Sequence, residues 1–339
     1  MPELPAIRRF VSDTQVRIYR IPYTFLPGLS GRVYLLVGAG PPSLVDAGSG
    51  QPGATRDILA GLDAVRSEFR EKVRLKDIRR FLVTHGHFDH VGGLWRLVRR
   101  TDAQVVAHAL DCRRVSAAEE RGELADKALR SFLHQAGVPP EQHEDIVEAQ
   151  RAPRRHVRSV PVDVLVEDGQ QLDGLRFIHT PGHSPGHLCI RVGNILLSGD
   201  HVLPKTVPQT WPESMAPYTG LGHYLEALDK LQRVEGIELA LGGHEPPMRN
   251  LYQRIDDIRA SHLRKLQRLT DILRKAPKPL SIAEMTAEMY SQQKGLYVML
   301  ALTDVGSRVE YLDQRGRLAI ANFDEVKREE RPVCRYRPV

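Results

Sequence analysis

The chain reads Thr84-His85-Gly86-His87-Phe88-Asp89-His90 immediately after the apolar run Phe81-Leu82-Val83. Three imidazoles and one carboxylate thus occur close together at the end of a predicted strand. Alternate side chains on a turn point to one side, so His85 and His87 converge on one position, while Asp89 and His90 face a neighbouring one. Imidazole nitrogen and carboxylate oxygen are ligands that zinc and iron accept. The pattern favours a metal-binding loop over a polar turn with incidental histidines.

Three later segments place similar side chains in the same setting. His183 lies in TPGHSPGH (180–187), Asp200 in LLSGDH (196–201) and His244 in ALGGHE (240–245). Each follows a short apolar run and lies near glycine, which lets the backbone approach a bound ion closely. Taken singly, such a histidine is more often a structural or surface residue. Their recurrence at strand ends indicates one shared site.

With these motifs the chain resembles the metallo-β-lactamase superfamily over roughly residues 15–250. HGHFDH matches the HxHxDH signature, and Val45-Asp46-Ala47-Gly48 matches the early aspartate motif. The resemblance implies an α/β fold, the αββα sandwich, with a two-metal site at one edge. It implies that the ligands of the first metal are His85, His87 and His183, and those of the second are Asp89, His90 and His244. Asp200 would bridge the two metals, and Asp46 would orient a ligand from behind.

The same resemblance implies hydrolysis. Two divalent ions, Zn²⁺ first with Fe or Mn as alternatives, would hold a bridging hydroxide that attacks a carbonyl or phosphoryl centre. Asp89 and Asp200 are the expected catalytic carboxylates. Redox di-iron relatives carry Glu where this chain has His87, and sulfur dioxygenase relatives use fewer ligands. The full ligand set therefore favours hydrolysis over redox chemistry.

Five further residues are candidates around this site. His187 and His201 are expected behind the metal ligands, with a substrate-facing position as the alternative for His201. Tyr218 and Tyr224 are candidates to supply a phenol to an oxyanion, and Lys205 to meet an anionic substrate tail. For each of the five, an ordinary core or surface role is the alternative.

Length and composition limit the possible domain organisation, location and cysteine chemistry of the protein. The 339 residues, 41% of them apolar and 27% charged, fit a large domain plus a smaller one. No apolar run of about 18 residues and no signal-peptide core occur, so a cytoplasmic protein that spans no membrane is expected. Cys112, Cys189 and Cys334 lie far apart without CxxC spacing. This spacing argues against a disulfide framework or a thiolate zinc site.

The net charge of +6 is concentrated at the C-terminal end, where residues 251–339 hold 17 Lys/Arg against 12 Asp/Glu. A basic domain of this kind can bind nucleic acid or an anionic substrate. The charges are dispersed, however, and no aromatic-interleaved motif accompanies them. A solvated surface is favoured, and nucleic acid stays an open alternative.

Apolar periodicity predicts the order of elements in a catalytic domain of residues 1–250. Strands are expected at 15–22, 32–46, 79–84, 105–108, 162–167, 175–179, 187–192, 194–198 and 237–241. Helices are expected at 54–72, 92–100 and 218–233. A helical insertion at about 109–155 precedes His183 and forms either a roof over the site or a plain connection.

After Pro246-Pro247 the pattern changes to helices at 250–275, from Ser281 onward, and at 297–312, followed by a strand at 317–321. Ser281 and Glu284 form a predicted capping box. This order resembles a winged-helix domain over residues 251–323. In some superfamily hydrolases such a domain packs over the site or at a dimer contact, so a homodimer is left open. The charged tail, 324–339, is expected to be partly disordered.

The favoured activity is hydrolysis of a thioester, ester or lactone, with an acyl thioester as the leading substrate, of the kind that glyoxalase-II-like enzymes or acyl-CoA thioesterases cleave. His244 follows Asp200 by only 44 positions, which leaves no room for the inserted domain of β-CASP nucleases. An acyl-homoserine-lactone-type lactonase and an endoribonuclease-like phosphodiesterase are the alternatives.

Overall fold

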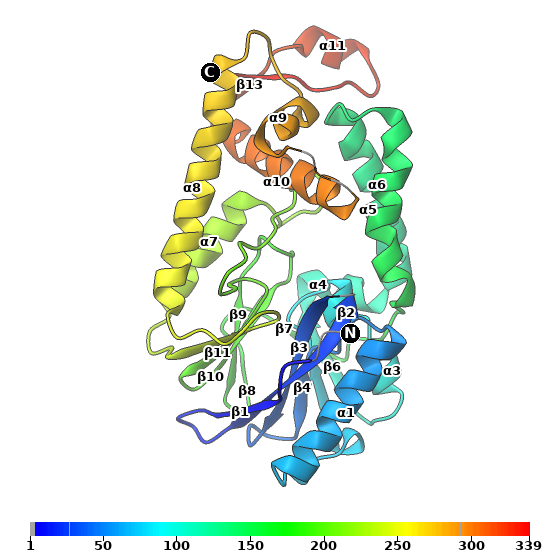
Figure 1. Ribbon diagram of the computed structural model, residues 1–339, viewed down its shortest axis with the longest axis vertical. Coiled ribbons are helices and arrows are strands. Elements are labelled where there is room, and N and C mark those ends of the chain that lie inside the picture. The colour runs from blue at the N-terminus through cyan, green and yellow to red at the C-terminus, as the bar shows by residue number, and fades with distance from the viewer. Residues whose placement is uncertain (1–3, 27, 292, 294) are drawn as a thin grey trace.

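The computed structural model describes residues 4–26, 28–291, 293 and 295–339. Two sheets pack face to face, with a group of helices beyond one end of them (Figure 1). The first sheet has the strand order β1 (Arg8–Val11), β2 (Arg17–Leu26), β3 (Leu29–Val37), β4 (Ser43–Val45), β5 (Arg80–Leu82), β6 (Gln104–His108) and β7 (Val164–Val166). The second has the order β12 (Leu239–Gly242), β11 (Ile195–Gly199), β10 (Leu188–Val192), β9 (Leu175–His179) and β8 (Gln171–Leu172).

Alternating strand positions fill separate cores on the two faces of each sheet. Ile18 and Leu36 point between the sheets, whereas Tyr19 and Leu35 pack toward α1 (Pro52–Glu68). The outer face of the second sheet is covered by α7 (Leu221–Gln232) and the first half of α8 (Leu251–Lys275), where Leu228 is fully buried. The layers therefore follow the order helix, sheet, sheet, helix, which confirms the predicted αββα sandwich.

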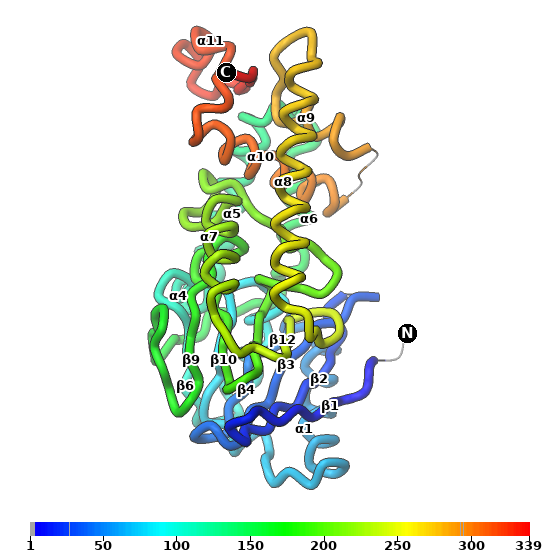
Figure 2. The backbone as a smooth tube through the Cα atoms, turned by 90° about the vertical axis from the view of Figure 1, so that its left-hand side faces the viewer, coloured from blue at the N-terminus to red at the C-terminus, as the bar shows by residue number. Residues whose placement is uncertain are grey.

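A separate core, away from the two sheets, joins the helical insertion to the C-terminal region. We call this part the helical lobe: α5 (Ala118–Gln135), α6 (His143–Arg151), the second half of α8, α9 (Ile282–Met289) and α10 (Leu296–Asp313). The preceding helix α4 (Ala109–Ser116) packs instead on the first sheet through Val115. Leu133 of α5 and Val147 of α6 share one buried cluster with Leu269 of α8 and Val305 of α10. Figure 2 shows α8 running from the sheets into the lobe. The first half of α8 packs on the second sheet and its second half packs within the lobe, so α8 holds the lobe against the sandwich.

A buried charge network fixes α10 within the lobe. The fully buried Arg308 contacts Asp304 at 2.6 Å and donates a hydrogen bond to Nδ1 of His262, on α8, at 3.0 Å. The hydroxyl of Tyr290 donates to Asp304 at 2.5 Å. Breaking a buried, hydrogen-bonded pair of this kind is costly, so the network fixes the position of α10 relative to α8.

The C-terminal tail is ordered, contrary to the expectation of partial disorder. It contains α11 (Phe323–Arg328) and β14 (Tyr336–Pro338), and β14 pairs antiparallel with β13 (Leu318–Ile320). Tyr336 also forms an isolated antiparallel bridge with Leu280, which ties the tail to the segment before α9. Backbone pairing across the chain thus orders a segment that looks merely charged in the sequence. The winged-helix-like character of residues 251–323 stays a prediction.

Several predicted boundaries were wrong for local backbone reasons. The expected strand 32–46 is split into β3 and β4 because Gly38 and Gly40 take φ of 104° and 65° and turn the chain. The helix expected from residue 218 begins at Leu221, after Gly220 at φ 97°. Strand β1 and the short helix α2 (Phe88–Val91) were not predicted, and the helix expected at 92–100 is the shorter α3 (Leu94–Val98).

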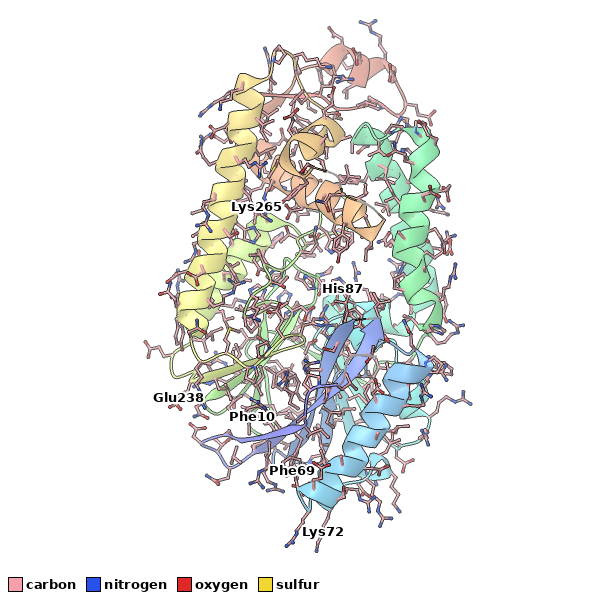
Figure 3. All side chains as sticks on the ribbon, in the orientation of Figure 1. Phe10, Phe69, Lys72, His87, Glu238 and Lys265 are labelled. Atoms are coloured by element: carbon pink, nitrogen blue, oxygen red, sulfur yellow. The ribbon has the colours of Figure 1, made fainter. Side chains whose placement is uncertain are left out.

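Among the described residues, no helix combines the length and apolar character needed to cross a bilayer. Figure 3 places His87 at the end of the sandwich that faces the helical lobe, with Phe69 and Lys72 at the opposite end.

Candidate metal centre

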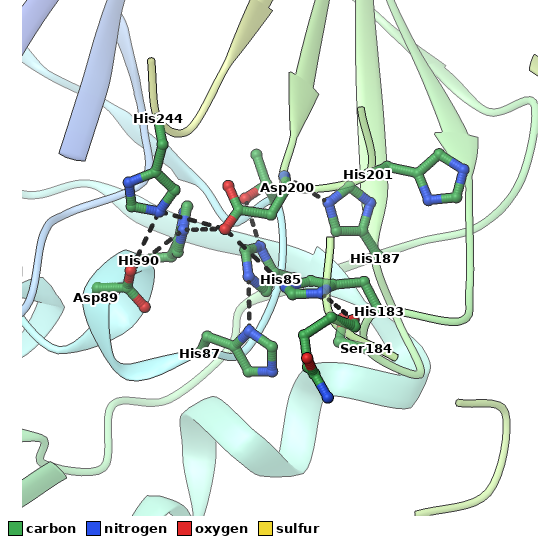
Figure 4. A network of polar contacts seen from close by, with 12 residues as sticks. His85, His87, Asp89, His90, His183, Ser184, His187, Asp200, His201 and His244 are labelled. Atoms are coloured by element: carbon green, nitrogen blue, oxygen red, sulfur yellow. Dashed lines mark hydrogen bonds and ion pairs between the residues drawn. The ribbon is translucent and has the colours of Figure 1, made fainter. Parts of the chain in front are cut away.

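The ends of neighbouring strands deliver the predicted ligands to one place (Figure 4). The loop after β5 carries His85 and His87, and the following helix α2 carries Asp89 and His90. His183 follows β9, Asp200 follows β11 and His244 follows β12. Five of these seven residues are under one-tenth exposed, a burial that polar groups rarely adopt without partners.

The ligand atoms form three overlapping groups, each within 4.8 Å: His85, His87 and His183; His85, His90 and Asp200; and Asp89, His90 and His244. Nε2 of His85 lies 3.0 Å from Nδ1 of His87. Nε2 of His244 lies 3.2 Å from both Asp89 Oδ2 and Asp200 Oδ2. Asp200 Oδ2 also lies 3.5 Å from Nε2 of His90 and 4.0 Å from Nε2 of His183, so it is placed between the two halves.

Three buried atoms in this cluster have no hydrogen-bond partner in the described part of the chain: Nε2 of His90, Nε2 of His183 and Oδ1 of Asp200. Leaving such atoms unsatisfied is unfavourable, and cations would satisfy them. Burial and neighbouring imidazoles hold the pKa of His85 and His87 well below the usual value, which keeps them in the neutral ligand form. Burial opposes protonation of His244, but the carboxylates of Asp200 and Asp89 raise its pKa to about 10. The cluster thus contains neutral imidazoles that can bind cations. It also contains carboxylates whose negative charge a bound cation would balance.

A second layer of hydrogen bonds orients these ligands. Asp46, which follows β4 in a left-handed conformation at φ 60°, accepts from Nδ1 of His90 at 2.7 Å and from Thr84 at 2.8 Å. Nδ1 of His183 donates to the Gln209 carbonyl at 2.8 Å, and Nδ1 of His244 contacts the Ser30 carbonyl at 3.3 Å. Each contact leaves the Nε2 lone pair directed into the cluster, as metal-binding histidines require.

A family model described as "Metallo-beta-lactamase superfamily" matches residues 26–273. The chain belongs to the metallo-beta-lactamase superfamily. This match extends over all seven predicted ligands and Asp46.

Curated relatives of this superfamily carry general names. "Probable metallo-hydrolase YqjP" of Bacillus subtilis is 23% identical over 310 residues, 87% of this chain and 91% of that protein. "Probable metallo-hydrolase YflN" of the same organism is 27% identical over 48% of this chain, which spans only 57% of that protein. The human "Acyl-coenzyme A thioesterase MBLAC2" is 27% identical over 48% of this chain and 54% of its own length. Two of these names denote metallo-hydrolases and the third a thioesterase, in line with a superfamily of metal-dependent hydrolases.

Solved structures extend the likeness to the helical lobe. A metallo-beta-lactamase family protein from Thermus thermophilus, TTHA1429, aligns with a TM-score of 0.76 and 25% identity over 95% of this chain and 98% of that one. A beta-lactamase domain protein from Burkholderia ambifaria aligns with a TM-score of 0.73 and 23% identity over 100% of this chain and 96% of that one. Since both alignments exceed the sandwich, the lobe is part of a fold shared within the superfamily.

His187 lies beside the predicted ligands, its ring 5.0 Å from that of His85, and His201 lies next to His187. Nε2 of His187 accepts from the backbone amide of Asp200 at 3.1 Å, which places its proton on Nδ1, toward the Thr180 hydroxyl at 2.8 Å. The ring of His201 lies 5.7 Å from that of His187 and is fully buried. His201 therefore does not face substrate, and burial lowers its pKa to about 3.

The three substrate-binding candidates do not reach the cavity beside the metal cluster. Tyr224 is fully buried and its hydroxyl donates to the His201 carbonyl at 2.6 Å, so its prediction as an oxyanion donor was wrong. Tyr218 is exposed near His223, and the backbone amide of Lys205 is bound by Glu245. Neither lines the cavity, so the sequence placed all three too close to the chemistry.

The cavity has a volume of about 430 Å³ and reaches His87, Asp89 and His183. One wall is apolar and consists of Trp211, Met215, Leu296, Met299 and Leu300. The opposite wall comes from α4, α5, α6 and the short helix η3 (Ala152–His156), and it is rich in arginine. Sequence analysis missed these lining residues because none belongs to a motif. Their placement depends on the lobe packing onto the sandwich.

The site can do chemistry on a bond held between the ligand cluster and these walls. When bound, divalent ions supply Lewis acidity and lower the pKa of a coordinated water. His85, His87 and His183 fit one ion, Asp89, His90 and His244 fit another, and Asp200 contacts both sets. The protein itself orients the ligands through Asp46, His187 and the Gln209 carbonyl, and the walls restrict access of bulk water.

Proposed function

We propose that this chain is a dinuclear metal-dependent hydrolase of acyl thioesters, with Zn²⁺ as the leading metal and Fe or Mn as alternatives. The apolar wall beside the ligand cluster carries this proposal. Trp211, Met299 and Leu300 offer an acyl chain a hydrophobic surface adjacent to His87 and Asp89. Burying an acyl methylene against such a wall contributes about 0.8 kcal/mol.

The helical lobe supports this reading over a nucleic-acid role. In a winged-helix arrangement, α10 would be the recognition helix, but most of its side chains from Met299 to Val309 are buried. Its first two turns instead supply Leu296, Met299 and Leu300 to the cavity. We infer that residues 251–323 are a winged-helix-like domain used as a roof over the site.

The relatives add a second line of support. Human MBLAC2 is named an acyl-coenzyme A thioesterase, and its matched segment belongs to the same superfamily. An acyl-homoserine-lactone-type lactonase would use the same ligand cluster, so lactones belong in the test.

A purified-enzyme screen tests the proposal. Acyl-CoAs, acyl-glutathiones, acyl-homoserine lactones and single-stranded RNA are offered to one preparation whose metal content is measured. We expect release of thiol from at least one thioester class, with weaker or no lactone opening. Cleavage of RNA alone, with affinity that falls steeply as salt rises, would replace the proposal with a phosphodiesterase. Sedimentation of the same sample shows whether the chain forms a homodimer, which the sequence leaves open.

A further inference from the structure

The arginine-rich wall of the cavity carries more positive charge than the ion pairs and hydrogen bonds of the fold require. Six arginines line it: Arg114, Arg121, Arg151, Arg154, Arg155 and Arg158. Of the residues that the structure describes, three carboxylates outside the ligand cluster line the same cavity: Glu119, Glu123 and Asp126. An apolar acyl chain has no use for this charge, so the wall fits another part of the substrate.

Two of these arginines have a structural role. Arg151 and Arg154 both pair with Asp126, whose side chain is almost fully buried. Arg154 also donates to the Gly122 carbonyl at 3.1 Å, which ties η3 to α5. Two guanidinium groups share one carboxylate, so the pairing leaves one positive charge uncompensated inside the wall.

The remaining arginines are held by contacts that a ligand can replace. Arg121 pairs with the exposed Glu120, and Arg155 pairs with the exposed Glu148. The Nη1 group of Arg158 donates to the carbonyls of Arg155 and Val157. Exposed ion pairs contribute little to stability, and a guanidinium binds phosphate in a two-pronged geometry. These side chains can therefore turn to a phosphate group at low cost.

The arginine side chains of the wall become more exposed to solvent with distance from the metal cluster. Side-chain exposure rises from 30% at Arg114 to 42% at Arg121 and 65% at Arg155. Arg114 marks the inner end, because its stem packs so closely over Gly86, between two metal ligands, that a Cβ there would lie 2.7 Å away. A substrate with its reacting carbonyl at the metal cluster would thus extend a leaving group along the arginines toward solvent.

We propose that the arginine wall binds the phosphates of a coenzyme A-type leaving group, so that the substrate is an acyl-CoA. This inference rests on the proposed thioester hydrolysis. It assigns the two cavity walls separately: the apolar wall takes the acyl chain, and the guanidinium groups of Arg121 and Arg158 take the nucleotide phosphates. A phosphorylated nucleotide is the part of coenzyme A that smaller thiols lack.

The test compares an acyl-CoA with the N-acetylcysteamine thioester of the same acyl chain, which has no phosphate. Variants are Arg121→Gln, Arg158→Gln and the double variant, with the exposed Arg100→Gln, which lies outside the cavity, as the matched control. Calorimetry measures the binding of coenzyme A itself to each protein. Arg114, Arg151 and Arg154 are left intact, because their contacts to Gly86 and Asp126 support the fold and the site.

We expect wild type to prefer the acyl-CoA. Each substitution should raise KM for the acyl-CoA, relative to that for the short thioester, by about tenfold, the size of a lost charged hydrogen bond. Arg100→Gln should leave both values unchanged, and added salt should weaken only the acyl-CoA. Arg158→Lys, which keeps the charge, should recover part of the affinity.

Each contrary result has a distinct meaning. Equal turnover of both thioesters by wild type and all variants would overturn the inference while leaving thioester hydrolysis intact. If no thioester is hydrolysed, the proposed function fails, and the binding of coenzyme A decides the inference. Binding that weakens in the double variant would support the arginine wall, and no binding would overturn it. RNA binding through Arg121 and Arg158 without coenzyme A binding would also overturn it.

Discussion

Oδ2 of Asp46 lies 2.7 Å from Nδ1 of His90, and both side chains are buried. This contact fixes the His90 proton on Nδ1 and directs Nε2 toward Asp200 and Asp89. The same carboxylate accepts from the amide and hydroxyl of Thr84. A side chain that contacts no substrate therefore positions the loop that carries the first ligands.

Asp46→Ala should weaken metal binding without abolishing it. The loss of a partner behind a ligand typically lowers metal affinity or activity by about 10–100-fold. Metal content after graded dialysis against a chelator, together with kcat, measures the effect. A loss of activity as large as that of the ligand variants below would instead place Asp46 among the ligands.

His87→Ala and Asp200→Ala should each abolish hydrolysis and lower the metal content. His87 belongs to one ligand group, whereas Asp200 lies between two, so Asp200→Ala should release more metal. Elemental analysis beside turnover tests the pair. A variant with wild-type turnover and a full metal load would refute the assigned site.

Gly243→Ala should disturb the cluster by steric contact alone. A Cβ at residue 243 would lie 2.4 Å from Oδ1 of Asp200 and 2.5 Å from Cε1 of His90. We expect metal content and activity to fall together. The control is Gly222→Ala, in α7, where a Cβ meets no atom closer than 3.8 Å and alanine favours the helix. Normal metal loading of Gly243→Ala would show that the ligands are not packed this closely against Gly243.

The helical lobe should lose stability in acid through His262. Burial and the Arg308 guanidinium lower its pKa to about 3, against an ordinary value of about 6.5. Below about pH 6.5, His262 binds a proton in the unfolded chain but stays neutral in the folded chain. Stability should therefore be full above about pH 6.5 and fall by up to about 1.4 kcal/mol per pH unit toward pH 3 from this group.

Chemical denaturation of wild type and His262→Gln at several pH values measures this contribution. The glutamine keeps an acceptor for Arg308 but cannot titrate, so the variant should show a shallower loss between about pH 6.5 and 5. The exposed His156→Gln serves as control and should follow wild type. Parallel curves for wild type and His262→Gln would contradict a buried neutral His262.

The sandwich and the ligand cluster could be predicted because apolar runs reveal the strands, and ligand-type residues beside glycine follow those runs. His85, Asp200 and His244 each follow an apolar run and lie next to or near glycine, and strand ends of one sandwich edge meet in space. The cavity walls could not be predicted in this way. Leu300 and Arg158 lie 142 positions apart in the sequence and line one cavity only because α10 packs against α5 and α6.

Errors at single residues had a similar origin. Tyr224 lies in a helix beyond Asp200, and the sequence does not show that its helix face turns into the core beside His201. The anchor of His183 is the backbone carbonyl of Gln209, a group that every residue possesses. Contacts made by backbone atoms and by packing direction leave no mark on residue type.

The central claim, metal-dependent hydrolysis of an acyl thioester, is tested most directly by thiol release before and after metal removal. A purified sample is analysed for bound metal, assayed with a medium-chain acyl-CoA, stripped with a chelator and then reloaded. We expect about two divalent ions per chain, in line with the two ligand sets, with turnover lost on stripping and restored on reloading. Thiol release that survives complete removal of metal would contradict the account.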